Sequence, residues 1–111
     1  MTLEDSIAAL QAKEEIRELT ARYCHAVVDG DAETIVSLFS SDGAFLAHTL
    51  AAHGQQELRD FYSNGVGAKT HKPFVQNHVI DLIDSDHAEG RCSVEIRVLQ
   101  DGEAYTQAGH Y

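Results

Sequence analysis

Apolar residues recur every three or four positions at the start of the chain, which is the spacing of a helix that buries one side. Up to residue 28 these residues form two stripes that are out of phase with each other. The first stripe contains Leu3, Ile7 and Leu10, and the second contains Ile16, Leu19, Tyr23 and Val27. The phase change predicts a short helix, then a kink, then a longer helix.

A helical hairpin is expected next. The run "DGD" at 29–31 ends the long helix, and Asp31 is placed to cap a second helix over Ala32–Ser40. The apolar side chains expected to turn inward from that helix are Ile35, Val36, Leu38 and Phe39.

Turn residues divide the middle of the chain into short elements. After "SSDG" at 40–43 we expect a strand over Ala44–His48, a loop, and a third helix over Gln55–Tyr62. The apolar anchors of this third helix are Leu58, Phe61 and Tyr62. The stretch "SNGVGAKTHKP" at 63–73 contains two glycines and the only proline, and it predicts a loop.

The pattern changes to a spacing of two at "HKPFVQNHVIDL", residues 71–82, which predicts a strand. Both faces of this strand carry apolar and hydrogen-bonding residues together. We expect Val75, Asn77 and Val79 to face inward, because the two valines continue an apolar lining, while Gln76 and His78 face outward. In the opposite register His78 would face inward and become the leading candidate for a catalytic base.

A second long strand, Ala88–Leu99, follows the turn "DSD" at 84–86. Asp101-Gly102 predicts a two-residue hairpin, since a type I′ turn requires positive φ at both central positions. The resulting pairs on one side of the sheet are Val98 with Tyr105, Ile96 with Gln107, Val94 with Gly109 and Cys92 with Tyr111. That side is mainly apolar and predicts a concave, lined face, whereas the other side carries Ser93, Glu95 and Arg97.

Composition narrows the class of protein. A chain of 111 residues with 43% apolar residues fits one folded domain, 1–111, with helices followed by strands in the α+β order. The formal net charge of -10 repels nucleic acid phosphates and anionic lipids, so neither nucleic acid nor membrane is an expected partner.

Cysteine and histidine spacing gives no sign of a metal site or cofactor. The two thiols, Cys24 and Cys92, form no CxxC motif, and the seven histidines show no ligand spacing within one helix. We therefore expect no metal, no cofactor and reduced thiols. The first residues are interrupted by acids and resemble neither a signal peptide nor a membrane span, so a cytoplasmic location is expected.

Four pieces of sequence occur in a familiar order: "EEIRELTARYCHAVVDGDAETIVSLFSSDGAF", "QQELRDFYSNGV", "NHVIDLIDSDHAEGRCSVEI" and "AGHY". Over nearly the whole chain they resemble the SnoaL-like family of the nuclear transport factor two-like superfamily, which includes scytalone dehydratase, hexachlorocyclohexane dehydrochlorinase and ketosteroid isomerases. The resemblance implies a cone-shaped α+β barrel, in which N-terminal helices pack in the concavity of a curved antiparallel sheet around a pocket for a small hydrophobic molecule.

The catalytic residues of these relatives transfer only in part. The dehydratase and dehydrochlorinase branch pairs a helix Asp with a His four residues before the strand Asn, and the matching positions here are Val28 and Pro73. Neither side chain transfers protons. Tyr23 matches the tyrosine donor of the isomerase branch, but the base position falls near Ala47 or His48, where there is no carboxylate.

The combined pattern and resemblance predict a pocket. Its expected lining is Tyr23, Val27, Phe45, Phe61, Val75, Asn77, Val94, Ile96, Gln107 and Tyr111. The catalytic candidates are Tyr23, His48 and Asp29. Tyr23 can equally be a core tyrosine, Asn77 can instead bond a neighbouring strand, and Asp29 is most simply a turn residue beside a helix end.

Three functions remain open at this point. A cofactor-independent lyase or isomerase requires a proton-transfer group in the cavity, whereas a lining with only Tyr, Asn and Gln as polar groups favours a binding protein. A structural or interaction module predicts a filled interior, against which a cavity of about 300 Å³ or more would count.

Self-association is also expected. Members of the family continue beyond "AGHY" into a further strand, so we expect an exposed strand edge over Ala104–Tyr111 that invites pairing with another chain. The resemblance implies a homo-oligomer, either a dimer or a trimer.

Overall fold

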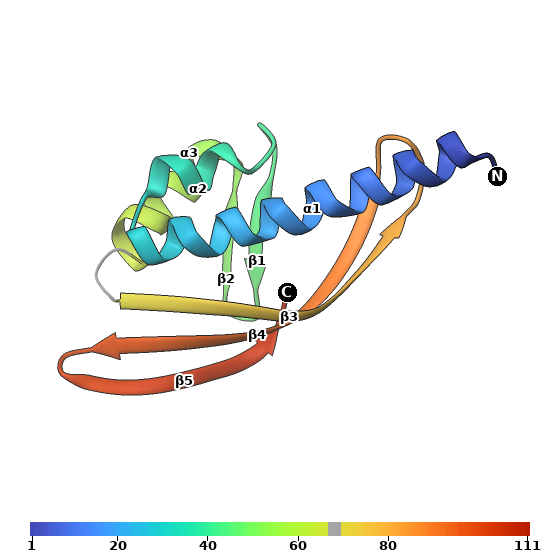
Figure 1. Ribbon diagram of the computed structural model, residues 1–111. Helices are drawn as coiled ribbons and strands as arrows, with labels where there is room; N and C mark the ends of the chain where they lie inside the picture. Colours follow the sequence, from blue (N-terminus) through green and yellow to red (C-terminus); the bar gives the residue numbers. More distant parts are fainter. Residues whose placement is uncertain (67–69) are drawn as a thin grey trace.

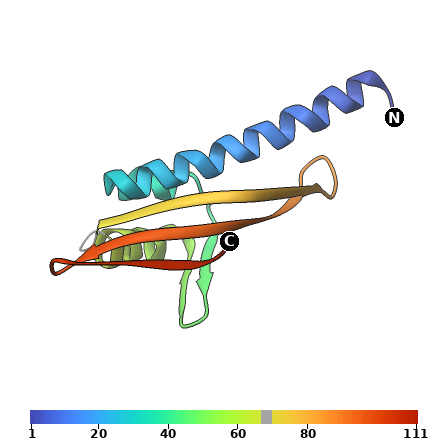
Figure 2. The ribbon, with the colours of Figure 1, turned by 60° about the horizontal axis from the view of Figure 1, so that its bottom comes forward.

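The computed structural model describes residues 1–66 and 70–111 and has the predicted α+β organisation. Its helices are α1 (Leu3–Asp29), α2 (Ala32–Ser37), α3 (Gly54–Asp60) and a π-helical turn η1 (Phe61–Val66). Its strands are β1 (Ala44–Ala47), β2 (Leu50–His53), β3 (Thr70–Leu82), β4 (Ala88–Gln100) and β5 (Glu103–His110). Helix α1 runs along the curved antiparallel sheet of β3, β4 and β5, nearest to β3 (Figures 1 and 2).

The apolar core lies at the C-terminal end of α1. There α2, α3 and the β1–β2 hairpin gather around the helix (Figure 1). The buried cluster consists of Ala26, Val27, Ile35, Val36, Ala52, Leu58 and Tyr62. Burial of side chains such as these supplies the main free energy of folding, at about 25 cal/mol for each Å² of apolar surface removed from water.

Helix α1 is continuous, so the predicted kink is wrong. A capping box between Thr2 and Asp5 starts the helix, and Gly30, with φ of 66°, ends it in the left-handed conformation. The first stripe, Leu3, Ile7 and Leu10, remains exposed. It packs against nothing in the described part of the chain, so the helix does not have to bend to bury it. None of the described helices combines the length and apolar content needed to cross a membrane.

The second predicted helix is confirmed, but its C-terminal end comes earlier than predicted. The Asp31 side chain accepts a hydrogen bond from the Thr34 backbone N–H at 3.1 Å, as expected of a cap, and Ile35 and Val36 are buried. The helix ends at Ser37 rather than Ser40.

The expected loop after β1 is instead the strand β2. Pairing of Phe45 with Ala52 places Ala52 in the core with only 3% of its surface exposed. The predicted loop at 63–73 is shorter than expected, because η1 extends to Val66 and β3 already begins at Thr70. Residues 67–69 of this predicted loop lie outside the described part of the chain.

The β4–β5 register is confirmed. Val94 pairs with Gly109, Ile96 with Gln107 and Val98 with Tyr105. Cys92 and Tyr111 exchange two backbone hydrogen bonds of 3.1 and 2.9 Å, and the turn residues Asp101 and Gly102 both have positive φ. All of β5 is exposed, and self-association through its edge stays a prediction.

The predicted register of β3 is wrong beyond Gln76, because the strand contains a bulge. Gln76 pairs with Ser93 but Val79 pairs with Arg91, so Asn77 and His78 together stand opposite Cys92. Asn77 has φ of 54°, a left-handed conformation that Asn tolerates better than most residues.

The bulge explains why both faces of this strand look mixed. The residues turned inward are His71, Pro73 and Val75 before it, and His78, Ile80 and Leu82 after it. Val79 is 61% exposed, and the Asn77 side chain donates outside the core to the Ser93 hydroxyl at 3.4 Å. The His78 ring lies close to Gly90: a Cβ atom added to Gly90 would be 3.3 Å from the Nε2 atom of His78.

The bulge predicts an unusual order of stability for two variants. Asn77→Ala and Asn77→Gly both remove the contact with Ser93, but only alanine is strained at positive φ, at a cost of about 1 kcal/mol. We expect Asn77→Ala to be the less stable variant in urea unfolding. At exposed Gln76, in the extended part of the strand, the same pair should reverse its order, and equal stability of the two Asn77 variants would contradict the assigned bulge.

Candidate functional site

A cavity of about 160 Å³ lies between the C-terminal half of α1 and the inner face of the sheet. We call it the tyrosine pocket. Its lining consists of Tyr23 and Val27 from α1, Phe45 from β1, Phe61 and Tyr62 from η1, His71 and Pro73 from β3, Ile96 from β4, Gln107 from β5, and Tyr111. Gln107 and Tyr111 are exposed, so the pocket opens to solvent on the side of β5.

Aromatic rings form the wall of this pocket. The ring of Tyr23 packs edge-on against Tyr62 and Tyr111, with centroids 6.1 and 6.0 Å apart. Phe45 and Phe61 stack at 5.2 Å. Edge-on and offset contacts of this kind are favourable beyond the area they bury, so the rings hold one another in place.

Two tyrosine hydroxyls meet inside the pocket. The Oη atoms of Tyr23 and Tyr62 are 2.9 Å apart, and Tyr62 is only 3% exposed. One hydroxyl donates to the other, and the hydroxyl that accepts keeps its own proton for a further partner. The Tyr111 hydroxyl also interacts with that of Tyr23, so the three hydroxyls form a chain in which each donates to the next and one O–H donor is left at the end for a ligand.

Burial keeps these hydroxyls protonated. It raises the pKa of Tyr62 to about 12, and it raises the pKa of Tyr23 as well, to which the neighbouring Tyr62 also contributes. Burial also raises the pKa of Tyr111, but this residue is 38% exposed and water screens its hydroxyl more effectively. The tyrosines are thus neutral donors at physiological pH rather than bases.

The remaining polar lining groups are the Gln107 amide and the His71 imidazole, and no carboxylate of the described residues lines the pocket. Imidazole is the lining group best suited to take up and release a proton. Within residues 1–66 and 70–111, no three side chains of the metal-ligating types gather closely enough to hold a metal ion.

The structure brings together most of the predicted lining. Tyr23, Val27, Phe45, Phe61, Ile96, Gln107 and Tyr111 all line the tyrosine pocket. Val75 and Val94 face inward elsewhere along the sheet. Asn77 lies outside, in a polar hollow that it shares with Val79 and Ser93, because the bulge turns it away.

Two of the three catalytic candidates lie elsewhere. His48 is exposed in the turn between β1 and β2, and Asp29 is exposed at the end of α1, where it lines a different surface hollow. Tyr23 alone reaches the pocket. His78, the alternative considered for a reversed register, does not line it either.

Sequence reasoning missed Tyr62, His71 and Pro73 as lining residues. His71 and Pro73 lie on the same side of β3 as Val75, so the alternation followed backwards from Val75 would have found them. Tyr62 was expected only as an anchor of the third helix, and the π-helical turn that carries it has no clear sequence signal.

Buried thiols lie near this region but are chemically quiet. Cys24 in α1 and Cys92 in β4 are both free, and burial raises the pKa of each thiol. A thiol that stays protonated is a poor nucleophile. Both cysteines therefore act here as small apolar residues.

Comparison with known proteins gives one family and several similar folds. The family described as SnoaL-like domain matches residues 8–111. No protein of curated function matches the chain in sequence.

Three solved structures illustrate the similarity of fold. Rv3472, a protein of unknown function from Mycobacterium tuberculosis that was solved as a variant with one substitution, has 22% identity and a TM-score of 0.84, over 92% of this chain and 64% of that one. An NTF2-like protein with a cystatin-like fold from Novosphingobium aromaticivorans has 24% identity and a TM-score of 0.82, over 97% of this chain and 75% of its own. A candidate scytalone dehydratase from the same organism has 19% identity and a TM-score of 0.86, over 96% and 74%.

At these identities the likeness establishes the fold. The chain spans 64% of the length of the Mycobacterium protein.

The raised tyrosine pKa values predict lower stability in alkaline solution. An unfolded tyrosine ionises near pH 10, whereas folded Tyr62 retains its proton until a pH of about 12. The unfolded chain therefore holds fewer protons between these values, and the free energy of unfolding falls as pH rises above about 10. Below pH 10 the contribution is fully present.

Urea unfolding between pH 8 and 11.5 measures this slope, to which each shifted tyrosine contributes up to about 1.4 kcal/mol per pH unit. Tyr62→Phe should flatten the slope. The matched variant Tyr105→Phe, at an exposed position, should leave it unchanged. An equal slope in the wild type and Tyr62→Phe would refute the assignment.

Proposed function

The chain belongs to the SnoaL-like domain family, and on that premise we propose that the tyrosine pocket binds a small, uncharged, single-ring molecule that carries one hydrogen-bond acceptor. The observation that supports this most directly is the Tyr23–Tyr62 hydroxyl pair inside an aromatic wall. That pair offers a neutral donor at a fixed position, and the rings around it offer an apolar surface.

The size of the cavity limits the ligand to about one ring. Engineered cavities of about 150 Å³ hold benzene, and the tyrosine pocket measures about 160 Å³. A cavity of about 300 Å³ or more would by itself have counted against a purely structural role, and this cavity is smaller. The argument for binding therefore depends on the polar groups that line the cavity, not on its size.

Charge selection follows from the lining. An anion would meet neutral tyrosines and, among the described lining residues, no arginine or lysine, so its lost hydration would be poorly replaced. A carbonyl oxygen can accept from the available hydroxyl without carrying a charge into the pocket. A neutral aromatic ketone has the required features.

A second candidate function is proton transfer at a carbon atom next to such a carbonyl group. The observation in its favour is that the His71 imidazole lines the same pocket as the hydroxyl pair. In this scheme His71 removes a proton from the α-carbon, the Tyr23–Tyr62 pair donates to the developing enolate oxygen, and the imidazole returns the proton. Return of the proton to a different carbon is the reaction of a cofactor-independent isomerase. If a group on the β-carbon instead leaves with its bonding electrons while the enolate collapses to an unsaturated ketone, the reaction is that of a lyase.

Binding is tested with three probes of similar size: acetophenone, ethylbenzene and benzoate. We expect acetophenone to bind most tightly because it places a carbonyl at the hydroxyl pair, ethylbenzene to bind less tightly, and benzoate to bind least. Chemical-shift titration of the ¹⁵N-labelled protein measures the three affinities. Either hydroxyl of the pair can donate when the other is removed, so the double variant Tyr23→Phe/Tyr62→Phe is needed to abolish the donor of the pair. It should weaken acetophenone about fivefold, in line with about 1 kcal/mol for a neutral hydrogen bond, and should spare ethylbenzene.

Tyr105→Phe is the matched control, since it removes a hydroxyl from an exposed tyrosine whose bond goes to Gln100. Its affinities should equal those of the wild type. Preference for benzoate, or shifts confined to residues outside the pocket, would overturn the binding proposal.

Proton transfer is tested with the same ketone. In D₂O the methyl protons of acetophenone exchange slowly, and an active pocket should accelerate this exchange by about 10²-fold or more over buffer. His71→Gln should abolish the acceleration while acetophenone still binds. If wild type binds the ketone without accelerating exchange, the protein acts as a binding protein for this class of ligand.

A further inference from the structure

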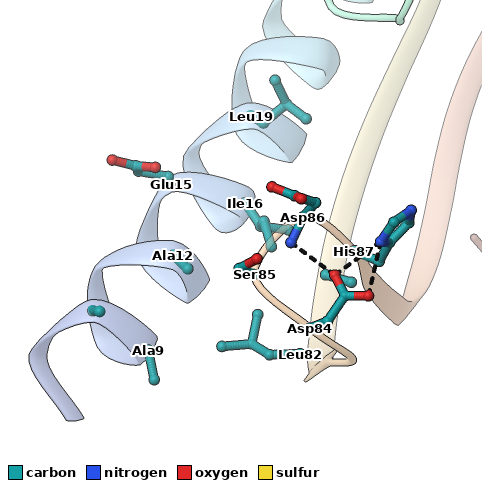
Figure 3. A pocket seen from close by; sticks show the side chains of 12 residues that line it. Ala9, Ala12, Glu15, Ile16, Leu19, Leu82, Asp84, Ser85, Asp86 and His87 are labelled. Carbon is teal, nitrogen blue, oxygen red and sulfur yellow. Dashed lines mark hydrogen bonds and ion pairs between the residues drawn. The ribbon is translucent and has the colours of Figure 1, made fainter. Parts of the chain in front are cut away.

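A separate groove of about 580 Å³ lies between the N-terminal half of α1 and the turn that joins β3 to β4 (Figure 3). It is at the opposite end of α1 from the tyrosine pocket and shares none of its lining. The residues that line the groove are Ala8, Ala9, Ala12, Glu15, Ile16, Leu19, Leu82, Asp84, Ser85, Asp86, His87 and Ala88.

Small side chains on α1 create the space. The groove runs from Ala8 to Leu19, a helix length of about 17 Å at 1.5 Å per residue. Alanines at one end of the groove have small side chains and leave space, while Ile16 and Leu19 supply apolar surface. Leu82 lies across from α1 on the side of β3 (Figure 3), and Ala88 of β4 also lines the groove. The groove thus accepts an extended apolar body.

Negative charge lies at the edge of this apolar floor. Asp84 is engaged within the turn, where it contacts the His87 Nδ1 atom at 2.8 Å and accepts from the Asp86 backbone N–H at 2.8 Å. The Asp86 carboxylate points from the turn toward α1 in Figure 3, and it has no ion-pair partner among the described residues. On the helix side, Glu15 accepts from the Gln11 amide at 3.3 Å and from no other side chain in the described part of the structure.

No lysine or arginine in the described part of the chain lines the groove to balance these carboxylates. An occupant that matches both features must present an apolar body to α1 and a positive charge to Asp86. A second copy of the chain fits poorly, because its net charge of -10 would be brought against an acidic rim. A neutral apolar molecule would leave the carboxylates with no new partner.

We propose that this groove binds an amphiphilic cation, a small molecule with an apolar chain or ring and one ammonium group, with the chain along Ala8, Ala12 and Ile16 and the ammonium group at Asp86. The cavity volume falls in the range of about 300 to 1,000 Å³ that is usual for sites of small ligands. The groove does not depend on the tyrosine pocket, so the two sites can be occupied independently.

The probe is octyltrimethylammonium at concentrations below micelle formation, compared with neutral octyl glucoside and anionic octyl sulfonate. The full chain, labelled with ¹⁵N, is titrated with each compound. We expect the cation to bind most tightly, with chemical-shift changes at the N-terminal half of α1 and at residues 84–88. Raising the salt concentration from 20 to 300 mM should weaken the cation and leave the neutral compound nearly unchanged.

Asp86→Asn preserves the shape of the side chain and removes its charge. It should weaken the cation about two- to fivefold, which is the range of an exposed ion pair, without changing the affinity for octyl glucoside. Asp101→Asn is the control: it makes the same change of charge in the distant β4–β5 turn, where asparagine also tolerates positive φ. Ala12→Leu should fill the groove and weaken both compounds.

Three results would overturn the proposal. The first is an equal loss of cation affinity in Asp86→Asn and Asp101→Asn, which would show that only the net charge of the protein matters and not the position of the carboxylate. The second is chemical-shift changes centred outside the groove. The third is a light-scattering mass that falls from two subunits to one as the cation is added, because a second copy would then be the occupant displaced.

Discussion

The extra residue at Asn77 lets strand β3 turn its inward-facing side chains to the same face of the sheet on both sides of the bulge. Before the bulge, His71 and Pro73 reach the tyrosine pocket, and after it, Ile80 and Leu82 continue along the inner face of the sheet. A strand with unbroken alternation would have to turn one of these sets to solvent. The positive φ of Asn77 is therefore the local strain on which the inner surface of the sheet depends.

The two cavities differ because their walls differ in side-chain volume and in charge. Aromatic rings narrow the tyrosine pocket and bury its hydroxyls, which raises the pKa of Tyr23 and Tyr62 and leaves neutral donors. Alanines widen the groove at the other end of α1, and the carboxylates at its edge are exposed to water. One helix thus borders both a neutral site and an acidic one.

The features that sequence predicted correctly are those set by local rules. Asp31 caps α2 because a short polar side chain before a helix satisfies the first backbone donors, and Asp101-Gly102 fixes the β4–β5 register because few residues accept its backbone angles. The register in turn places Ile96 and Gln107 beside each other in the pocket. The resemblance to the family supplied the direction in which that face would curve.

The features that sequence missed depend on contacts between distant residues. Strand β2 reads "LAAH" and has no β-branched residue, so only its pairing with β1 makes it a strand. The bulge adds one residue without any Gly or Pro to mark it, and an alternation read with a fixed spacing of two passes over it. Whether Leu3, Ile7 and Leu10 pack or stay exposed depends on what lies opposite them in space, and the phase of a stripe does not contain that information.

Continuity of α1 connects these points. The helix has 27 residues, but its neighbours differ from end to end: α2, η1 and the β-sheet bury Ala26 and Val27, whereas the β3–β4 turn covers only one side of the N-terminal half. A free-standing helix of this length gains little stability from propensity alone, so packing at the C-terminal end and the capping box at Thr2 must support the exposed part. The N-terminal half of α1 therefore does not need large side chains on the side that faces the sheet, and it carries alanines there. These small side chains leave the space that forms the groove.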